Sequence, residues 1–316
     1  MINIAVVGAS GAFGKKHLEA LASVKSARLV ATADPIPAAH PNDRSINHYD
    51  SLDALLSDPV LKCDAVILAT PTPLHAEQAL ACIAADKHVL VEIPMADSLA
   101  DAQALLTAAA NKPHLCAMAG HVRRFNPSHQ WIHQQISQGE LTLQHLQATT
   151  YFFRRSNTNA LGEPRTWTDH LLWHHACHTV DLFLHQTHQA PCQGFALAGP
   201  THPELGIAMD MTIGLKSDSG SLCSLALSFN NEGPFGTEFR YICDKGTYIA
   251  RYDDLVDGEG RPIDLSEVSE ISNGIALIDQ AFVDSINTGK PNAASFEHAF
   301  GAMQVLAELS EQLEAG

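Results

Sequence analysis

The chain has 316 residues and a mass of 34.0 kDa, a length that predicts about two domains. Apolar residues make up 46% of the chain and charged residues 17%, which excludes general disorder and predicts a large buried core. The formal charge of −16 repels phosphate backbones and anionic lipid. Nucleic acid and membrane surfaces are therefore not expected as partners, and an anionic ligand would require arginines gathered at its site.

Targeting signals and disulfide patterns are not evident in the sequence. No stretch reaches the roughly 18 apolar residues of a membrane-spanning helix, and Met1 leads directly into an apolar run without a basic leader. The seven cysteines are scattered and include no Cys-x-x-Cys pair, which is typical of reduced, buried thiols. These features predict a cytoplasmic protein.

Residues 1–121 alternate short apolar runs with helix-like stretches, as parallel β-α-β units do. The expected strands are 2–7, 29–33, 65–69, 88–91 and 115–119. Apolar residues at helical spacing mark 13–23, 74–85 and 98–110, with Ser98 as an N-cap. This half is predicted to be an α/β, doubly wound Rossmann domain.

Residues 122–316 follow a different pattern, in which strand-like runs are bunched together. Helices are expected at 127–138, 168–186, 275–286 and 296–313, and strands at 149–154, 207–215, 222–229, 239–242 and 247–251. Such bunching predicts an α+β domain with an open mixed, largely antiparallel sheet. The last helix is free to pack back on the first domain.

A glycine-rich loop follows the first expected strand and opens the first helix. Its glycines allow a tight turn and close approach to a pyrophosphate, which the helix N-terminus then binds. The spacing is Gly-x-x-Gly-x-x-Gly, one residue longer than the usual dinucleotide motif. The alternative is a tight turn without a ligand. The expected contacts come from Gly8, Ser10, Gly11, Ala12, Phe13 and Gly14.

Asp34 ends the second expected strand, about 20 residues beyond the loop, where a carboxylate accepts both ribose hydroxyls and repels a 2′-phosphate. This favours NAD, although His40 and Arg44 could meet the 2′-phosphate of NADP. The alternative for Asp34 is a turn residue before a proline. The segment 70–72, comprising Thr70, Pro71 and Thr72, ends the strand 65–69 at the sheet edge that binds ligands.

Histidines are concentrated in residues 167–181. On a helix His170, His174 and His178 share a face, with Asp181 one turn further on. The cluster could be a metal site, a proton-transfer site or a polar helix face. Three histidines along one straight face diverge from a single ion, which argues against metal, and proton transfer is favoured because neutral histidine accepts a proton near pH 7. His178 is the candidate acid/base residue, with His174 or His175 assisting.

Arginines are also concentrated, at positions 123, 124, 154, 155 and 165 of an acidic chain. Guanidinium groups bind carboxylates through two hydrogen bonds, so Arg123, Arg124, Arg154 and Arg155 are predicted to contribute to an anion-binding pocket. Adjacent residues on a strand point to opposite faces, so one arginine of each pair should enter it. Surface ion pairing is the alternative.

Several motifs together resemble the Gfo/Idh/MocA family of NAD(P)-dependent oxidoreductases. They are the glycine loop, Val91-Glu92-Ile93-Pro94, the segment 120–127, and His178-x-x-Asp181. The resemblance implies a Rossmann domain and a second domain whose open sheet pairs subunits as a homodimer. It also implies cofactor contacts from His75, Glu92 and Ile93, and substrate contacts from Trp167, Asp169 and His170.

Two positions depart from the common family pattern: Ile93 replaces the usual catalytic lysine, and His174 replaces an aspartate. Stretches at 150–155, 167–176, 206–211 and 228–231 are similar to a subgroup that oxidises the hemiacetal of a ring-cleaved aromatic dicarboxylate. That similarity implies hydride transfer to NAD or NADP, with histidine in place of lysine. The alternatives are a dehydrogenase of another acidic sugar or hydroxy acid, or a non-catalytic dinucleotide sensor.

Overall fold

The computed structural model describes residues 1–36, 46–158, 162, 164–165, 167–188 and 193–315. His40 and Arg44 lie outside the described residues. The chain forms two compact units, one of Met1–His121 with Ile275–Phe300 and one of Val122–Gly274 with Gly301–Gly316. The first unit therefore also includes a segment from late in the sequence.

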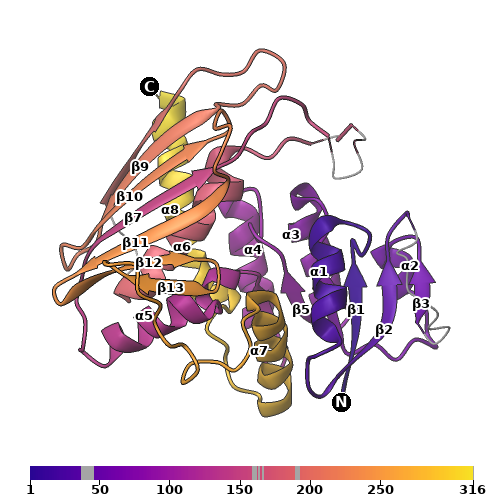
Figure 1. Ribbon diagram of the computed structural model, residues 1–316. Coiled ribbons are helices and arrows are strands. Elements are labelled where there is room, and N and C mark those ends of the chain that lie inside the picture. Colours follow the sequence, from indigo (N-terminus) through magenta and orange to yellow (C-terminus); the bar gives the residue numbers. More distant parts are fainter. Residues whose placement is uncertain (37–45, 159–161, 163, 166, 189–192, 316) are drawn as a thin grey trace. The chain divides into compact units, whose positions relative to one another are not determined.

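The first unit is a doubly wound parallel α/β unit. Its strands are β1 (Ile2–Val7), β2 (Ala27–Ala33), β3 (Asn47–Tyr49), β4 (Ala65–Leu68), β5 (His88–Val91) and β6 (Ala117–Ala119). Its helices are α1 (Ala12–Leu21), α2 (Leu52–Leu56), α3 (His75–Ala84), α4 (Leu99–Ala110) and, apart from its first residue, α7 (Gly274–Thr288), with a 3₁₀ turn at Thr72–Leu74. The strand order is β3-β2-β1-β4-β5-β6 (Figure 1).

The central strands of this sheet are apolar because helices cover both faces. All four residues of β4 are fully buried. Ser98 caps α4, since its hydroxyl oxygen accepts a hydrogen bond from the Asp101 N–H at 3.1 Å, as predicted. The order of strands reverses between β1 and β4, and ligands bind at such a point in open parallel sheets.

The second unit contains a seven-stranded sheet in the order β13-β12-β11-β7-β10-β9-β8. Its strands are β7 (Leu143–Tyr151), β8 (Gln193–Ala198), β9 (Asp210–Lys216), β10 (Leu222–Ser228), β11 (Gly236–Cys243), β12 (Gly246–Arg251) and β13 (Asp254–Asp257). Its helices are α5 (Pro127–Ser137), α6 (Cys177–Thr187) and, from Gly301, α8 (Phe296–Ala315), with a 3₁₀ turn at Val122–Arg124 and a π-helical segment at Leu171–Ala176. Among the described strands of this sheet, only β7 and β10 pair in parallel, so the predicted fold class is confirmed.

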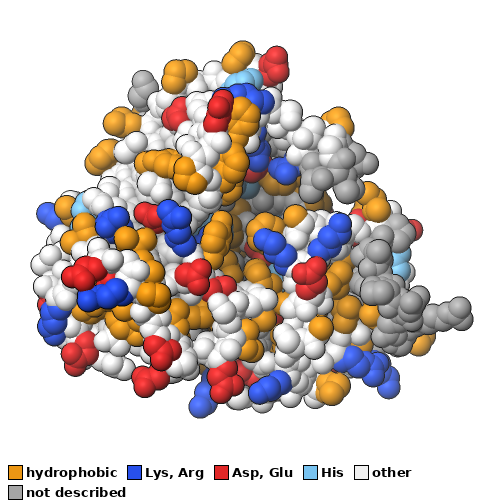
Figure 2. Space-filling model, viewed as in Figure 1, with side chains coloured by type: hydrophobic (Ala, Val, Ile, Leu, Met, Phe, Trp, Pro, Cys, Tyr) orange, Lys and Arg blue, Asp and Glu red, His pale blue; other side chains and the backbone are white. Residues whose placement is uncertain are grey.

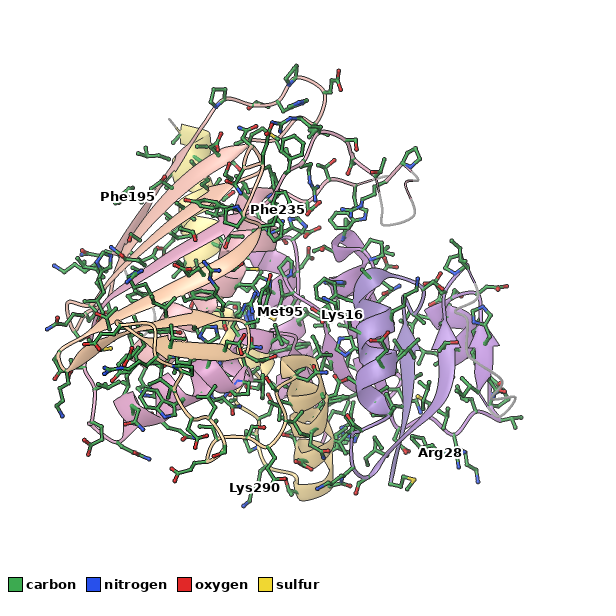
Figure 3. The ribbon with its side chains drawn as sticks, viewed as in Figure 1. Lys16, Arg28, Met95, Phe195, Phe235 and Lys290 are labelled. Carbon is green, nitrogen blue, oxygen red and sulfur yellow. The ribbon has the colours of Figure 1, made fainter. Side chains whose placement is uncertain are left out.

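One face of this sheet is buried and the other is open. In β9 the residues alternate, with Met211, Ile213 and Leu215 buried and their neighbours more exposed, as a sheet covered on one side requires. The opposite face carries Phe195 and Leu197, which are 53% and 66% exposed; Phe195 is labelled in Figure 3.

Strands β3, β8 and β13 and helix α2 were not predicted, and the bounds of several predicted elements differ from the structure, most of all those of one strand and one helix. Strand β7 begins at Leu143 instead of residue 149, because Gln144, His145 and Gln147 interrupt the apolar pattern by which a strand is recognised. The helix expected at 168–186 begins only at Leu171, and its first six residues are π-helical. His170 precedes it in extended backbone, so His170, His174 and His178 do not form the straight helical row that the spacing predicted.

Acidic and basic side chains are interspersed with apolar ones on the face drawn in Figure 2. None of the helices in the described part of the chain is long and apolar enough to cross a membrane.

Candidate dinucleotide and substrate sites

The glycine loop lies between β1 and α1 in a backbone conformation that side chains would disrupt. Gly8 has a φ of +78°, and a Cβ there would lie 2.5 Å from the carbonyl oxygen of Ala69. A Cβ on Gly14 would lie 2.1 Å from the Gly8 oxygen, so this glycine lets the helix approach the strand closely. The middle glycine of the loop, Gly11, is the N-cap of α1.

The N-terminus of α1 is open to an anionic ligand. Gly11 provides no side-chain cap, and the first turn contains no acidic residue, so the N–H groups of Ala12 and Phe13 have no side-chain cap there. Lys16, labelled in Figure 3, extends over the ring of Phe13 with Nζ 4.6 Å from its centre. The tight cradle and the uncapped N-terminus fit the pyrophosphate of a dinucleotide.

Asp34 lies directly after β2, beside the glycine loop. Its Oδ2 accepts a hydrogen bond from the Ser10 N–H at 3.0 Å, and its Oδ1 accepts one from the Ile36 N–H at 2.9 Å. Each carboxylate oxygen has a further lone pair, so the side chain can still accept hydrogen bonds from ribose hydroxyls. The Ser10 hydroxyl donates to the Ile36 carbonyl oxygen.

The loops that follow β4 and β5 are joined by His75. Its ring nitrogens lie 2.8 Å from the carbonyl oxygens of Thr70 and Pro94, and the side chain is buried. Thr72 is also buried. His75 therefore holds the segment containing Pro71 against the turn that contains Ile93, at the carboxyl edge of the sheet.

Glu92 has partners that the sequence did not reveal. Its Oε1 lies 2.9 Å from His17 Nε2, and His17 Nδ1 lies 2.8 Å from Asp279 Oδ1. His17 and Asp279 are completely buried. His17 and Asp279 are 262 residues apart along the chain, so no sequence motif indicates their contact. The one sequence feature that could have pointed to it is a histidine on the apolar face of the helix predicted at 13–23.

Asp169 is the centre of a charged cluster in the second unit. Arg154 binds both of its carboxylate oxygens, Arg165 Nη1 lies 3.0 Å from Oδ1, and His175 Nε2 lies 3.2 Å from Oδ2. Burial disfavours the carboxylate, but hydrogen bonds from His175 and Arg154 hold the pKa of Asp169 well below its usual value. Two guanidinium groups share one carboxylate, so the cluster carries excess positive charge.

Aromatic rings surround this cluster. The Arg154 guanidinium lies 4.7 Å from the ring centre of Phe229, and the His175 ring lies edge-on to the same ring at 5.0 Å. Arg155 is exposed, lies over the ring of Phe153 and donates to the Arg154 carbonyl oxygen at 2.7 Å. Aromatic faces reduce hydration of the guanidinium groups, which strengthens their interaction with anions.

His174 is held by its own turn. Its Nδ1 accepts a hydrogen bond from the His170 N–H at 3.2 Å, and its ring stacks on Trp167 at 5.4 Å. Burial and the neighbouring His170 lower the pKa of His174 to about 3, so it is neutral at pH 7. His178 lies half-buried in the first turn of α6.

The contacts of Arg123 and Arg124 lie outside the Asp169 cluster. Arg124 binds Asp181 through two hydrogen bonds of 2.8 and 2.5 Å, with both side chains buried. Arg123 is buried between the rings of Phe239 and Tyr252. The structure therefore brings Arg154 and Arg165 together with Asp169. Arg123 and Arg124 instead contact aromatic rings and Asp181, respectively.

Within the described residues, no group of three or more histidine, cysteine, aspartate or glutamate side chains is placed to hold a metal ion.

Comparison with known proteins decides the family. Residues 2–121 match the oxidoreductase family with an NAD-binding Rossmann fold, and residues 127–269 match the C-terminal domain of bacterial oxidoreductases. The chain is 52% identical over 99% of both lengths to 4-carboxy-2-hydroxymuconate-6-semialdehyde dehydrogenase of a Sphingobium strain. The chain belongs to the Gfo/Idh/MocA oxidoreductase family. The predicted family is thus confirmed, and a nicotinamide dinucleotide is its cofactor.

Solved structures of this family share the fold. The chain aligns with myo-inositol 2-dehydrogenase of Lactobacillus plantarum with a TM-score of 0.81 and 15% identity, covering 100% of this chain and 98% of that one. It aligns with UDP-N-acetylglucosamine 3-dehydrogenase of Acidithiobacillus ferrooxidans with a TM-score of 0.79 and 21% identity, covering 99% and 98%. At these identities the likeness establishes the fold alone.

Proposed function

We propose that this protein oxidises the cyclic hemiacetal of 4-carboxy-2-hydroxymuconate-6-semialdehyde to 2-pyrone-4,6-dicarboxylate, in the breakdown of protocatechuate. The 52% identity over nearly the whole chain supports this substrate. The observation that carries the proposal within the molecule is the cluster of Arg154, Arg165 and His175 around Asp169. It combines carboxylate-binding groups with a histidine, which the oxidation of an anionic hemiacetal requires.

The reaction removes a hydride and a proton from one hemiacetal group. The C–H bond breaks with its electron pair, the O–H bond loses a proton, and the carbon becomes the carbonyl carbon of a lactone. A nicotinamide dinucleotide held by the glycine loop would supply the hydride acceptor. The protein must therefore orient the hemiacetal carbon and accept one proton.

Arg154, Arg155 and Arg165 are proposed to hold the substrate carboxylates. Each guanidinium has five N–H donors, and Asp169 occupies two of those on Arg154 and one on Arg165. The remaining donors can bind a dicarboxylate while Asp169 fixes the two side chains. Such prior ordering reduces the entropy lost on binding. Trp167 and His170 complete the proposed pocket.

The proton acceptor is proposed to be a histidine of the group His174, His175 and His178. The contact between His175 and Asp169 favours His175, because a carboxylate orients the ring and stabilises the imidazolium that forms. His174 is committed to its stacking and backbone contacts, and its low pKa makes it a weak base.

NAD is proposed as the preferred dinucleotide. Asp34 lies beside the glycine loop, where its negative charge repels a 2′-phosphate and its oxygens accept ribose hydroxyls. The remaining proposed contacts come from the loops after β4 and β5, including Glu92.

A homodimer through the open face of the seven-stranded sheet is also proposed. Phe195 and Leu197 of β8 and Leu222 of β10 are exposed there, and exposed apolar side chains on one sheet face mark an interaction surface. A cytoplasmic location is also proposed. The six cysteines among the described residues are free thiols, which supports it.

The deciding experiment supplies the purified protein with enzymatically generated 4-carboxy-2-hydroxymuconate-6-semialdehyde and either NAD or NADP. Absorbance of the reduced nicotinamide is followed, and the pyrone is identified by mass. Rapid reduction with pyrone formation is expected, faster with NAD. Dinucleotide binding with no turnover would support a sensor. Turnover only with another acidic sugar or hydroxy acid would assign a different substrate to the protein.

A further inference from the structure

His17 joins three distant parts of the first unit. It lies on α1, Glu92 follows β5, and Asp279 lies on α7. The two ring nitrogens of His17 lie 2.9 Å from Glu92 Oε1 and 2.8 Å from Asp279 Oδ1. An ionised carboxylate can only accept hydrogen bonds, so both ring nitrogens donate only when the imidazole is doubly protonated.

The charge of this cluster is set by its two carboxyl groups. Burial alone would make His17 neutral, but Asp279 and Glu92 outweigh burial and raise the pKa of His17 to about 10. A neutral histidine would direct a lone pair at one carboxylate. The protonated ring therefore acts as a fixed cationic link between the two acidic side chains.

The second oxygen of Glu92 is also constrained. Its Oε2 accepts a hydrogen bond from the Ile93 N–H at 3.3 Å. A Cβ on Gly120 would lie 3.1 Å from this oxygen, so the glycine leaves the space that the carboxylate occupies. Glu92 has a side-chain exposure of 12%, which keeps it partly accessible at the carboxyl edge of β5.

We propose that His17 is a positioning residue of the dinucleotide site, acting through the Glu92 carboxylate. The inference rests on the proposed contact between Glu92 and the dinucleotide. His17 fixes which Glu92 oxygen faces the protein interior. Asp279 holds His17 from the opposite side, so α7 supports the site without taking part in it.

The test measures dissociation constants for NAD and NADH in the absence of substrate, together with the thermal unfolding midpoint. The variants are H17Q, E92Q and the double variant H17Q/E92Q. H17Q and E92Q should each weaken NAD binding roughly tenfold, the effect of one hydrogen bond to a charged group. The double variant should bind no more weakly than the weaker single variant, because both changes remove the same interaction.

D279N is the comparison variant, since it leaves Glu92 unchanged but removes one of the two negative charges that keep His17 protonated. It should lower the unfolding midpoint and weaken NAD binding less than H17Q does. If loss of affinity follows loss of stability in all variants, His17 has only a structural role and the inference is wrong. Absence of dinucleotide binding by the wild-type protein would instead overturn the proposed function and the inference together.

Nitrogen NMR of the wild-type protein with ¹⁵N-labelled histidine covers the case in which H17Q does not fold. One histidine should keep both ring nitrogens protonated at pH 9, and its resonances should shift when NAD is added. If every histidine carries only one ring proton at pH 9, or if the resonances are unchanged by NAD, the inference is contradicted.

Discussion

The carboxylate of Asp34 accepts a hydrogen bond from the backbone N–H of Ser10 at 3.0 Å. The residue proposed to select the dinucleotide is thus also a support of the glycine loop that would bind its pyrophosphate. Selection between NAD and NADP and the shape of the loop are therefore coupled. A change at Asp34 should affect both, whereas a change confined to the Ser10 side chain keeps the N–H that Asp34 binds and removes only the hydrogen bond from the Ser10 hydroxyl to Ile36.

D34S is expected to reverse part of the preference for NAD. The ratio of kcat/KM for NADP to that for NAD should rise by roughly tenfold to a hundredfold, because two hydrogen bonds to a charged acceptor and the repulsion of a 2′-phosphate are lost. Steady-state kinetics with each dinucleotide measure the ratio. The control S10A keeps the N–H that Asp34 binds and should leave the ratio unchanged. An unchanged ratio in D34S would remove Asp34 from cofactor selection.

R154K is expected to weaken substrate binding more than it slows turnover. Lysine keeps the charge but lacks the two-pronged contact that Arg154 makes with Asp169 and the flat face that packs on Phe229. We expect KM for the dicarboxylate to rise by roughly tenfold to a hundredfold, with an unchanged NAD dissociation constant. The control R251A removes an exposed arginine paired with Glu238 and should have no effect. Equal KM values in R154K and R251A would refute the assignment.

Substitution of the two candidate bases separates their roles. H175N should lower kcat by about 10²–10⁴-fold, because it removes the histidine that Asp169 orients. H178N should lower kcat less, and both variants should bind NAD as the wild-type protein does. Single-turnover rates measured over pH 6–9 make the comparison. A larger loss of kcat in H178N than in H175N would instead identify His178, on α6, as the base.

Features that depend on residues close together in the chain could be predicted from the sequence. The glycine loop, the capping Ser98 and the strand-rich second unit follow from local spacing, and the fold class is confirmed. The cluster around Asp169 was only partly predictable: Arg154 and His175 were singled out, but their shared carboxylate depends on how a loop returns to the sheet.

Features that depend on tertiary packing could not be predicted from sequence. The link between His17 and Asp279 joins residues 262 positions apart, and a single sequence carries no record of that contact. The π-helical segment Leu171–Ala176 has no side-chain signature, since the same residues favour an ordinary helix. Its wider turn, in which hydrogen bonds span one residue more than in an α-helix, changes which histidines share a face, which is why the predicted row was wrong.

L197D should separate the proposed dimer. A charge on the open sheet face, at the edge strand β8, would be buried without a partner on association, which is strongly unfavourable. Leu197 is 66% exposed in the single chain, so folding should be preserved. Sedimentation of the wild-type protein should show a dimer and L197D a monomer. The control V60D introduces the same charge at a residue of the other unit that is 82% exposed, and it should leave the dimer intact.

Acid should destabilise the fold through buried neutral histidines, most clearly His185. Its ring stacks on His133 at 3.9 Å, and burial together with Arg124 lowers its pKa to about 3. Because the unfolded side chain titrates near pH 6.5, the unfolded state takes up protons first. The stability that His185 contributes is thus present above pH 6.5 and lost as pH falls toward 3, by up to about 1.4 kcal/mol per pH unit. Denaturant unfolding between pH 7.5 and 4.5 should show a shallower decline in H185Q than in the wild-type protein and the exposed control H114Q. Equal slopes in all three proteins would show that His185 does not govern this loss.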